Sequence, residues 1–459
     1  MNRDDPVADL IPALAPLVPA AVDELHIAAV LESRGVTDAM ARETYGYPDV
    51  FALAKSVSPR LAFAAAALDR PERKAPGALR TLAHGPLYAL PCAVYPAVFV
   101  TLGAPAMLRG LVLATAVGWV AGMGMSVAAF QLLGQGRHRQ AGRVLRLLGS
   151  AALLAGLGAA WLLAAVGPGG PEMVAFVVAQ LGFQLGAAVL VFHGKELRLV
   201  ALMLPACVAG VVYYAAGLPA ELSRPTLLVG AASSVLVMAV AGYATVVRSA
   251  KPDPPRPAPL PRTLLATLPS VGYAAISAGF LLYTDARYLT APFDVSIGVA
   301  PLVLGMGVLE WRSHRFAERA DALMHTAGSP AAFRRDVWRV VLGELGLCML
   351  VLVGLGTALL LVLAEFGSLS FEGALLIDAH LVLGGAYFIG FLLANHQRFR
   401  PLLVVTAAVL AVYVPLTILV APRLAPYGEI PIFLGSATLL LLLLLTALRR
   451  GIGDVHRYR

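Results

Sequence analysis

The chain has 459 residues, of which 59% are hydrophobic and 14% are charged, and its mean hydropathy is +0.78. An ordinary soluble domain is excluded, because such domains are about 45–50% apolar and about 25% charged. The net charge of +8 comes from bases at the ends of apolar stretches, with no basic stripe between aromatic residues. This pattern indicates a membrane topology signal and argues against a nucleic-acid partner.

The sequence contains no pattern typical of a cofactor site or of an enzyme. Cys92, Cys207 and Cys348 each lie alone in an apolar stretch, without metal-ligand or disulfide spacing. There is also no nucleotide-binding motif and no Ser-His-Asp cluster. We therefore expect no cofactor, no metal and no catalytic role.

Residues 1–80 contain no apolar stretch long enough to cross a bilayer. Helical spacing covers residues 23–34 and ends at Gly35, Thr37 can cap a second helix, and Asp49 can cap a third over residues 50–57. The sequence therefore predicts a small helical module in the cytoplasm. It either packs as an appendage or docks a partner, for which we expect a glycosyltransferase.

Twelve apolar stretches follow, each near the ~20 residues that a helix needs to cross a bilayer. They cover residues 87–103, 107–133, 143–166, 172–192, 197–217, 225–247, 264–284, 289–310, 339–364, 371–394, 401–421 and 429–448. The predicted fold class is therefore an all-α, multi-pass membrane protein of twelve spans. Prolines interrupt several of these spans and could permit bending, namely Pro91, Pro96, Pro269, Pro301 and Pro415.

Loop charge predicts the orientation of the spans. Lys and Arg gather before the first span and after every even-numbered span, whereas the opposite loops carry only Arg109, Arg224, Arg287 and Arg423. The positive-inside rule then places both termini in the cytoplasm of a protein of the cell membrane. Among the outer residues, Asp285 and Arg287 are expected to form a solvated pair in a short turn.

A Pro-rich stretch at residues 249–262 divides the spans six plus six, since its prolines favour an extended spacer. The predicted organisation is a module (1–80), a first lobe (81–248), the linker (249–262), a second lobe (263–448) and a basic tail (449–459). Each lobe opens with Pro-x-x-x-Tyr and carries a GMG triplet in its second span, at 122–124 and 305–307. These repeats indicate two parallel six-helix lobes with a site between them.

The stretch GMGMSVAAFQLLGQGRHRQAGRVLR at residues 122–146 leads from an apolar helix into a Gly-flanked basic turn. It resembles the junction between spans 2 and 3 of the multidrug/oligosaccharidyl-lipid/polysaccharide exporter superfamily. The charged stretch from Glu310 to Arg339 resembles the Pel-type exopolysaccharide exporter branch, although its charges also suit an amphipathic surface helix. The resemblance covers residues 87–448 and implies two lobes forming a V, a central cavity and alternating access.

This resemblance implies export or flipping of a saccharide-containing substrate, with membrane lipid and a lipid-linked saccharide as partners. No Lys or Arg lies in the middle of a span, whereas flippases for lipid-pyrophosphate sugars tend to place bases there. The second lobe does carry carboxylates within its spans, as cation-coupled drug exporters do. A drug exporter of the same fold and a non-transporting scaffold of a polysaccharide synthase complex are therefore the alternatives.

Ionisable residues inside a span are costly in hydrocarbon and each requires an explanation. Asp378 and His380 lie in the tenth span, with Asp378 about 10 Å below its outer end at 1.5 Å per residue, and Asp294 lies at a similar level in the eighth. They could form a proton or cation relay that faces the cavity, with Asp294 and His380 as the partners of Asp378. Alternatively, they make structural hydrogen bonds or contact water.

Polar and aromatic residues in other spans could line a saccharide cavity, because sugars bind amide groups and aromatic faces. Gln180 and Gln184 share one helical face at i, i+4 spacing. Together with them we predict the lining residues Tyr88, Tyr95, Tyr273 and Ser277. Hydrogen bonding between packed helices explains the same residues equally well.

The predicted topology can be tested by cysteine labelling from outside the cell. A cysteine placed at Gly169 or Ser368 should react with an impermeant reagent, and one placed at Gln135 or Pro257 should not. Labelling at Pro257 from outside would contradict the division into six plus six spans.

Overall fold

The computed structural model describes residues 7, 10–14, 24–68, 77–250, 253, 260–289, 291–326, 330–424 and 427–451, without the side chains of 62–68 and 324–330. Every regular element within these residues is helical. Most of the predicted linker and residues 452–459 of the predicted tail lie outside the described residues. The predicted domain boundaries stay a prediction.

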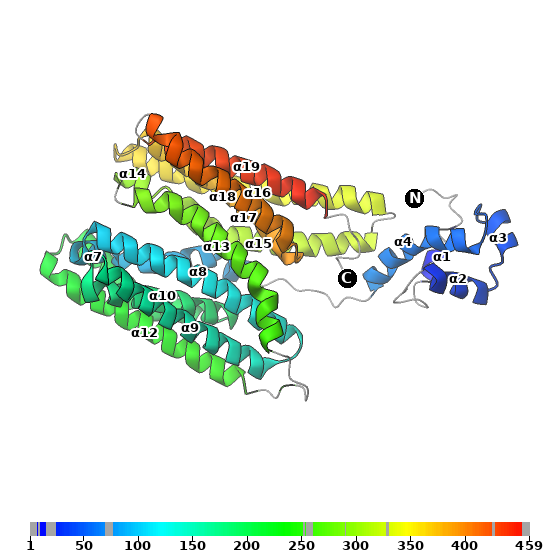
Figure 1. Cartoon of the computed structure of the whole chain (residues 1–459), viewed down its shortest axis with the longest axis horizontal. Helices are drawn as coiled ribbons and strands as arrows, with labels where there is room; N and C mark the ends of the chain where they lie inside the picture. Colours follow the sequence, from blue (N-terminus) through cyan, green and yellow to red (C-terminus); the bar gives the residue numbers. More distant parts are fainter. Residues whose placement is uncertain are drawn as a thin grey trace. The chain divides into compact units, whose positions relative to one another are not determined.

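All twelve predicted spans are helices long and apolar enough to cross a membrane, which confirms an all-α, multi-pass membrane protein (Figure 1). The first span consists of α5 (Ala78–Leu82), α6 (His84–Ala89), the 3-10 helix η1 (Leu90–Val94) and α7 (Tyr95–Leu102). The others of the first set are α8 (Ala104–Gly134), α9 (His138–Ala165), α10 (Gly170–Phe192), α11 (Glu196–Ala215) and α12 (Ser223–Arg248), with η2 (Ala220–Leu222) before α12. The second set comprises α13 (Leu260–Tyr288), the short α14 (Phe293–Ser296), α15 (Ala300–Thr326), α16 (Pro330–Glu365), α17 (Phe371–Asn395), α18 (Phe399–Leu419), η3 (Ala421–Arg423) and α19 (Glu429–Arg449).

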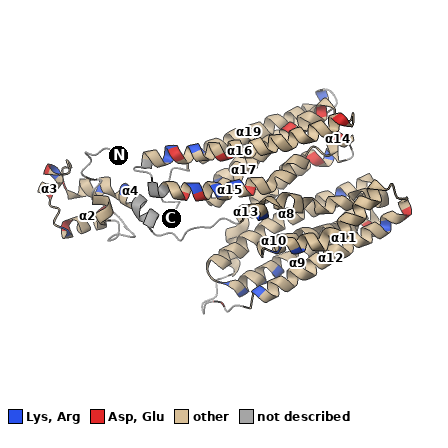
Figure 2. Ribbon diagram, turned by 180° about the vertical axis from the view of Figure 1, so that it is seen from behind, with Lys and Arg blue, Asp and Glu red and all other residues tan. Residues whose placement is uncertain are grey.

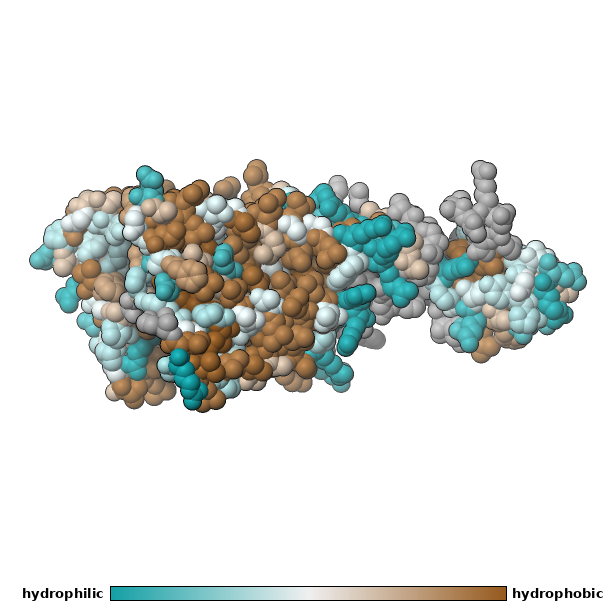
Figure 3. Space-filling view, turned by 90° about the horizontal axis from the view of Figure 1, so that it is seen from above, coloured by the Kyte–Doolittle hydropathy of each residue, from teal (hydrophilic) through white to brown (hydrophobic). Residues whose placement is uncertain are grey.

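The surface agrees with this assignment. Charged residues gather near the helix ends and leave the middle of most spans uncharged (Figure 2). Hydrophobic residues cover much of the face that Figure 3 shows over these helices. An apolar exterior of this kind suits lipid, since scattered charge would be costly there.

Proline breaks the first span, as predicted, but not every span that contains it. Pro91 and Pro96 fall where α6 gives way to η1 and then α7, because proline removes a backbone donor and crowds the preceding turn. Gly210 of α11 accommodates this break, since a Cβ there would overlap the Ala93 carbonyl oxygen. By contrast, α13 and α18 stay continuous through Pro269 and Pro415.

Contacts divide the chain into two compact units. One comprises residues 1–78, 309–350 and 445–459, and the other comprises 79–308 and 351–444. Within the first unit, α1 (Leu10–Leu14), α2 (Glu24–Ser33), α3 (Asp38–Glu43) and α4 (Val50–Leu68) share a hydrophobic core of their own. The caps at Thr37 and Asp49 form as predicted, but the third predicted helix continues past residue 57 to Leu68.

The Gly-flanked basic turn at residues 134–143 is held by residues that follow α12 in the sequence. Arg137, at the N-cap of α9, makes no side-chain cap, and the Asp253 carboxylate instead accepts from the backbone N–H groups of Arg139 (2.7 Å) and Gln140 (3.0 Å). Ser249 packs on Gly142, where any Cβ would overlap its hydroxyl. The glycine and the helix N-terminus in this motif therefore bind the residues that follow α12.

His193 lies beside the same end of α12. Its Nε2 donates to the Thr245 hydroxyl oxygen at 3.3 Å, because that hydroxyl donates in turn to the Ala241 carbonyl at 2.8 Å. Burial, with Arg248 and Lys195 nearby, lowers the pKa of His193 from 6.5 to about 4. Because this folded-state pKa is depressed, the neutral imidazole supports the fold above pH 6.5, and that support is lost as the pH falls towards 4.

Replacing Asp253 with alanine should release the α9 N-terminus, because two backbone donors lose their acceptor. A lost cap of this kind costs about 1 kcal/mol. Hydrogen exchange of the peptide around residues 138–145 should accelerate, and Glu365→Ala, at an exposed helix end, is the control. Unchanged exchange in Asp253→Ala would show that the carboxylate does not hold this helix.

Candidate functional site

The most buried of the twelve spans is α17, which carries an ionisable residue with no exposed surface. Small residues allow this close packing. For example, a Cβ at Gly384 would lie 2.6 Å from Leu352, and one at Gly356 would lie 3.0 Å from Leu381. His380 is thereby enclosed between α17 and its neighbours. An imidazole in such a place must find its hydrogen-bond partners inside the protein.

Both ring nitrogens of His380 have partners. Nδ1 lies 2.8 Å from the Leu376 carbonyl oxygen, and Nε2 lies 3.0 Å from Oδ1 of Asp285 on α13. A carbonyl oxygen only accepts, so Nδ1 must carry a proton. Nε2 and Oδ1 can then bond only if one further proton lies between them, on the imidazole or on the carboxyl group. The pair is therefore a site that holds one proton.

Aromatic rings pack around His380, whereas the Asp285 side chain is 19% exposed. The Phe433 ring lies 5.3 Å from that of His380 and 5.9 Å from that of Tyr413, which in turn contacts Phe280. The Tyr413 hydroxyl bonds the Thr284 hydroxyl at 2.6 Å, next to Asp285 in the sequence. In such apolar surroundings charge interactions are stronger than in water, so an unprotonated pair would be strongly unfavourable.

The structure separates the residues that we expected to act together. Asp378 is exposed on α17 and makes no hydrogen bond or ion pair with any residue that the structure describes. The partner of His380 is Asp285, which belongs to α13 rather than to a turn. The expected solvated pair of Asp285 with Arg287 is therefore wrong, and Arg287 instead stacks on the Tyr283 ring at 4.5 Å.

Asp294 also differs from the expected relay. It lies in the short helix α14 and is buried, and its Oδ2 accepts from the backbone N–H of Ser370 at 2.9 Å and from the Ser370 hydroxyl. That hydroxyl accepts from the Gly373 N–H at 3.0 Å. Asp294 thus completes the N-terminal cap of α17 and is not in contact with Asp378 or His380.

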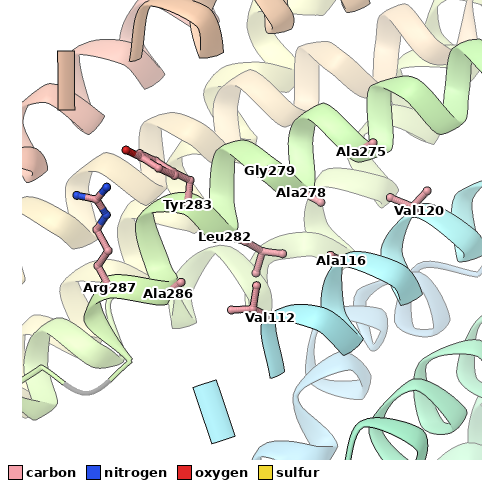
Figure 4. Close-up of a pocket in the computed structure, with 10 residues that line it drawn as sticks. All are labelled: Val112, Ala116, Val120, Ala275, Ala278, Gly279, Leu282, Tyr283, Ala286 and Arg287. Carbon is pink, nitrogen blue, oxygen red and sulfur yellow. The ribbon is translucent and has the colours of Figure 1, made fainter. Parts of the chain in front are cut away.

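An open, almost wholly apolar cavity of about 550 Å³ lies along α8 and α13 (Figure 4). Its walls are small or apolar apart from two side chains. The residues that line it are Val112, Ala116 and Val120 of α8, and Ala275, Ala278, Gly279, Leu282, Tyr283, Ala286 and Arg287 of α13. In Figure 4, Val112 and Leu282 lie close together between the helices, whereas Tyr283 and Arg287 extend from the side of α13 that faces away from α8. The Tyr283 ring lies 5.6 Å from that of Tyr413 on α18.

None of the residues predicted to line a cavity belongs to this one. In the first set of spans, Gln180 is buried and bonds Tyr95, and Gln184 covers Gly118 of α8, where a Cβ would overlap its side-chain oxygen. Tyr88 is exposed on α6. In the second set, Tyr273 and Ser277 are buried, and the Ser277 carbonyl accepts from the Tyr387 hydroxyl at 3.3 Å. Their role in substrate binding stays a prediction.

Close backbone contacts join α5 and α6 of the first span to α15. A Cβ at Gly85 would overlap the Leu304 carbonyl oxygen, and one at Gly307 would lie 2.5 Å from the Leu82 carbonyl oxygen. Trp119 of α8 meets Tyr387 of α17 edge-on, with ring centroids 6.1 Å apart. Spans before the linker thus pack directly against spans after it.

A buried charge cluster was missed by the sequence analysis. Glu344 of α16 has no exposed surface and lies 3.2 Å from Arg312 and 2.7 Å from Arg319, both on α15. The predicted surface helix between residues 310 and 339 is instead the adjoining ends of α15 and α16, which are continuous with their spans. The spacing of Arg312 and Arg319, at i, i+7 on one helical face, was the available signal.

No protein-family model and no curated protein matches this chain. Among solved structures, the MATE multidrug transporter DinF-BH, solved in complex with a ligand, matches 83% of this chain and 95% of its own, with a TM-score of 0.52 and 13% identity. A MOP superfamily transporter from Pyrococcus furiosus matches 86% and 96%, with a TM-score of 0.47 and 15% identity. An inward-facing MATE family transporter matches 83% and 99%, with a TM-score of 0.43 and 13% identity.

The TM-scores of the last two matches are below 0.5, so these matches carry no inference. The first shows that the fold of this chain is similar to that of a MATE transporter. Because the sequence identity is only 13%, this similarity concerns the fold alone.

Proposed function

We propose that this chain is a secondary membrane transporter coupled to protons through Asp285 and His380. The observation that carries the proposal is the 3.0 Å contact between Nε2 and Oδ1, which requires one proton. Loss of that proton leaves a carboxylate facing the lone pair of a fully buried imidazole. The repulsion favours separation of α13 from α17, so that proton binding and helix position are linked.

The position of α13 supports a link between this pair and a substrate bound in the cavity beside α8. The helix carries Asp285 on one side and contributes seven of the residues that line the cavity. Because Asp285 and Ala286 are neighbours on one rigid helix, a shift of Asp285 moves the cavity wall. This arrangement supports coupling between protonation and substrate binding.

The contacts of α6 with α15 support alternating access. The cavity is open between α8 and α13, whereas Gly85 of α6 meets the backbone of α15 and Gly307 of α15 meets the backbone of α5, with no side chain between them. An open region and a close contact between spans of the two sets are expected if access alternates between two sides. Both termini are proposed to be cytoplasmic, from the loop charge.

We also propose what this transporter carries and which protein it binds. Export of a saccharide, expected from the resemblance, suits an apolar cavity only if the saccharide is linked to a lipid. The likeness to a multidrug transporter supports drug export equally well. The separate core of α1–α4 supports a docking role for residues 1–80, with a glycosyltransferase as the proposed partner.

Replacing Asp285 with asparagine should abolish transport driven by a pH gradient, because the amide keeps the size of the carboxyl group and cannot be protonated reversibly. Uptake of a cationic rhodamine dye and of fluorescein into proteoliposomes measures this, with a loss of at least about tenfold expected. A loss of that size corresponds to about 1.4 kcal/mol.

Asp378→Asn is the matched control, since Asp378 lies exposed on α17, the helix that carries His380, and we expect it to behave as the wild type. His380→Gln should resemble Asp285→Asn. Gradient-driven uptake that is intact in Asp285→Asn would refute the coupling site.

Adding a methyl group at Gly85 or Gly307 should weaken the contact of α5 and α6 with α15, because the colliding atoms belong to the backbone and cannot rotate away. Overpacking of this kind typically costs about 1–3 kcal/mol. Thiol labelling of a cysteine at Ala286 in the cavity should therefore fall about tenfold in Gly85→Ala as the population shifts.

Gly343→Ala and Gly346→Ala are matched controls, since a Cβ at either position meets no atom within 4 Å. If labelling at position 286 is the same in all four variants, the contact of α5 and α6 with α15 does not control access to the cavity.

A further inference from the structure

We propose that the exposed side of α9 binds the headgroup of an anionic phospholipid through Arg139, Arg143 and Arg146. We call these three side chains the α9 arginine row. The ligand is a phospholipid of the bilayer leaflet that surrounds the turn between α8 and α9. The inference goes beyond the proposed transport function and does not depend on the substrate or on proton coupling.

The α9 arginine row lies on one face of its helix. Its members are spaced at i, i+4 and i+7, and this spacing places them on the same side of an α-helix. All three residues are exposed. The opposite side of α9 includes the buried residues Val144 and Leu145 and packs against α8 and α10. The row therefore lies on the side of α9 that no other span covers.

The same side of α9 continues as an apolar surface that suits lipid, and α9 is the least buried of the twelve spans. From Arg146 to Ala165 the helix rises about 29 Å at 1.5 Å per residue, close to the ~30 Å of a hydrocarbon core. Arg146 therefore lies at the edge of the hydrocarbon, and Arg139 lies about 10 Å further out, among the lipid headgroups. The large apolar residues of this surface that are more than half exposed are Leu147, Leu154, Trp161 and Leu162.

The positive charge of the α9 arginine row is not balanced within the protein. α9 contains no Asp or Glu, and none of the three arginines forms an ion pair with a residue that the structure describes. The Arg146 side chain donates only to the Gly142 carbonyl, at 3.3 Å. Asp253 brings one negative charge to the start of α9, where it accepts from two backbone N–H groups. At least two of the three positive charges are therefore left for an external anion.

Arginines at the adjoining ends of α15 and α16 differ in this respect. Arg315 lies 2.7 Å from Glu318, and Arg339 lies 2.9 Å from Asp336, so their counter-charges belong to the protein. The α9 arginine row has the position of a lipid-binding surface and lacks such partners. A phosphate group suits it, because guanidinium groups bind phosphate through paired hydrogen bonds. A zwitterionic headgroup carries its own cation, so an anionic lipid should bind more tightly.

The test is native mass spectrometry of the full-length protein in a non-ionic detergent. Phosphatidylglycerol and phosphatidylcholine with identical acyl chains are added together, and the wild type should retain phosphatidylglycerol more tightly. The triple variant Arg139→Gln, Arg143→Gln, Arg146→Gln should bind phosphatidylglycerol at least about tenfold more weakly, since each base near an anionic lipid surface contributes roughly fivefold. Binding of phosphatidylcholine should not change.

Two further variants separate charge from damage to the fold. Arg139→Lys, Arg143→Lys, Arg146→Lys should keep most of the preference, because lysine keeps the positive charge. Arg143→Gln alone should weaken phosphatidylglycerol binding roughly fivefold. The Arg143 side chain makes no hydrogen bond or ion pair with a residue that the structure describes, so its loss removes no contact of this kind from the fold.

The matched control is the triple variant Arg315→Gln, Arg335→Gln, Arg339→Gln. It also removes three bases, but their carboxylate partners lie within the protein. It should retain phosphatidylglycerol as the wild type does. Inorganic pyrophosphate at the same concentration as the lipid should not displace phosphatidylglycerol from the wild type.

Four results would overturn the proposal. They are equal retention of the two lipids by the wild type, unchanged phosphatidylglycerol binding in the glutamine variants of the α9 arginine row, an equal loss in the control variant, and displacement of the lipid by pyrophosphate. Binding is measured without substrate and without a pH gradient, so each result is independent of the proposed transport function.

Discussion

The hydrogen bond between His380 and Asp285 is the interaction on which the account depends. In hydrocarbon, a polar group without a partner costs several kcal/mol. The imidazole satisfies Nδ1 within its own helix and must reach another helix to satisfy Nε2. The bond between α17 and α13 therefore exists only with a proton, and a change in proton concentration acts directly on the packing of two spans.

The same constraint explains other features of the spans. Asp294 is tolerated because the N-terminus of α17 supplies its donors, and Glu344 is tolerated because Arg312 and Arg319 supply its counter-charges. Glycine has a complementary role at Gly85, Gly210 and Gly307, where the backbones of different helices meet directly. Polar residues inside the membrane thus hold particular helices together, and glycines set how closely other helices approach.

Much of the fold could be predicted from the sequence, because hydropathy over some twenty residues is a local signal. All twelve spans appear where the apolar stretches lie, and the break of the first span at Pro91 and Pro96 follows from proline chemistry. The pairing of ionisable residues could not be predicted. His380 and Asp378 are close in sequence but lie on different faces, whereas Asp285 is 95 residues away and meets His380 only through the packing of α13 on α17. Likewise, the amides of Gln180 and Gln184 share a helical face, but the sequence does not show that this face meets Tyr95 and Gly118 rather than a cavity.

The most direct test is the protonation state of His380, followed by ¹⁵N NMR of the histidine side chains across pH, with His380→Gln used for assignment. The account predicts that Nδ1 carries a proton while its hydrogen bond to the Leu376 carbonyl is made. It also predicts that the single proton between Nε2 and Asp285 is lost in one step, and that the step disappears in Asp285→Asn. A His380 ring protonated only on Nε2, with Nδ1 unprotonated, would contradict the account, as would a titration that is unchanged by Asp285→Asn.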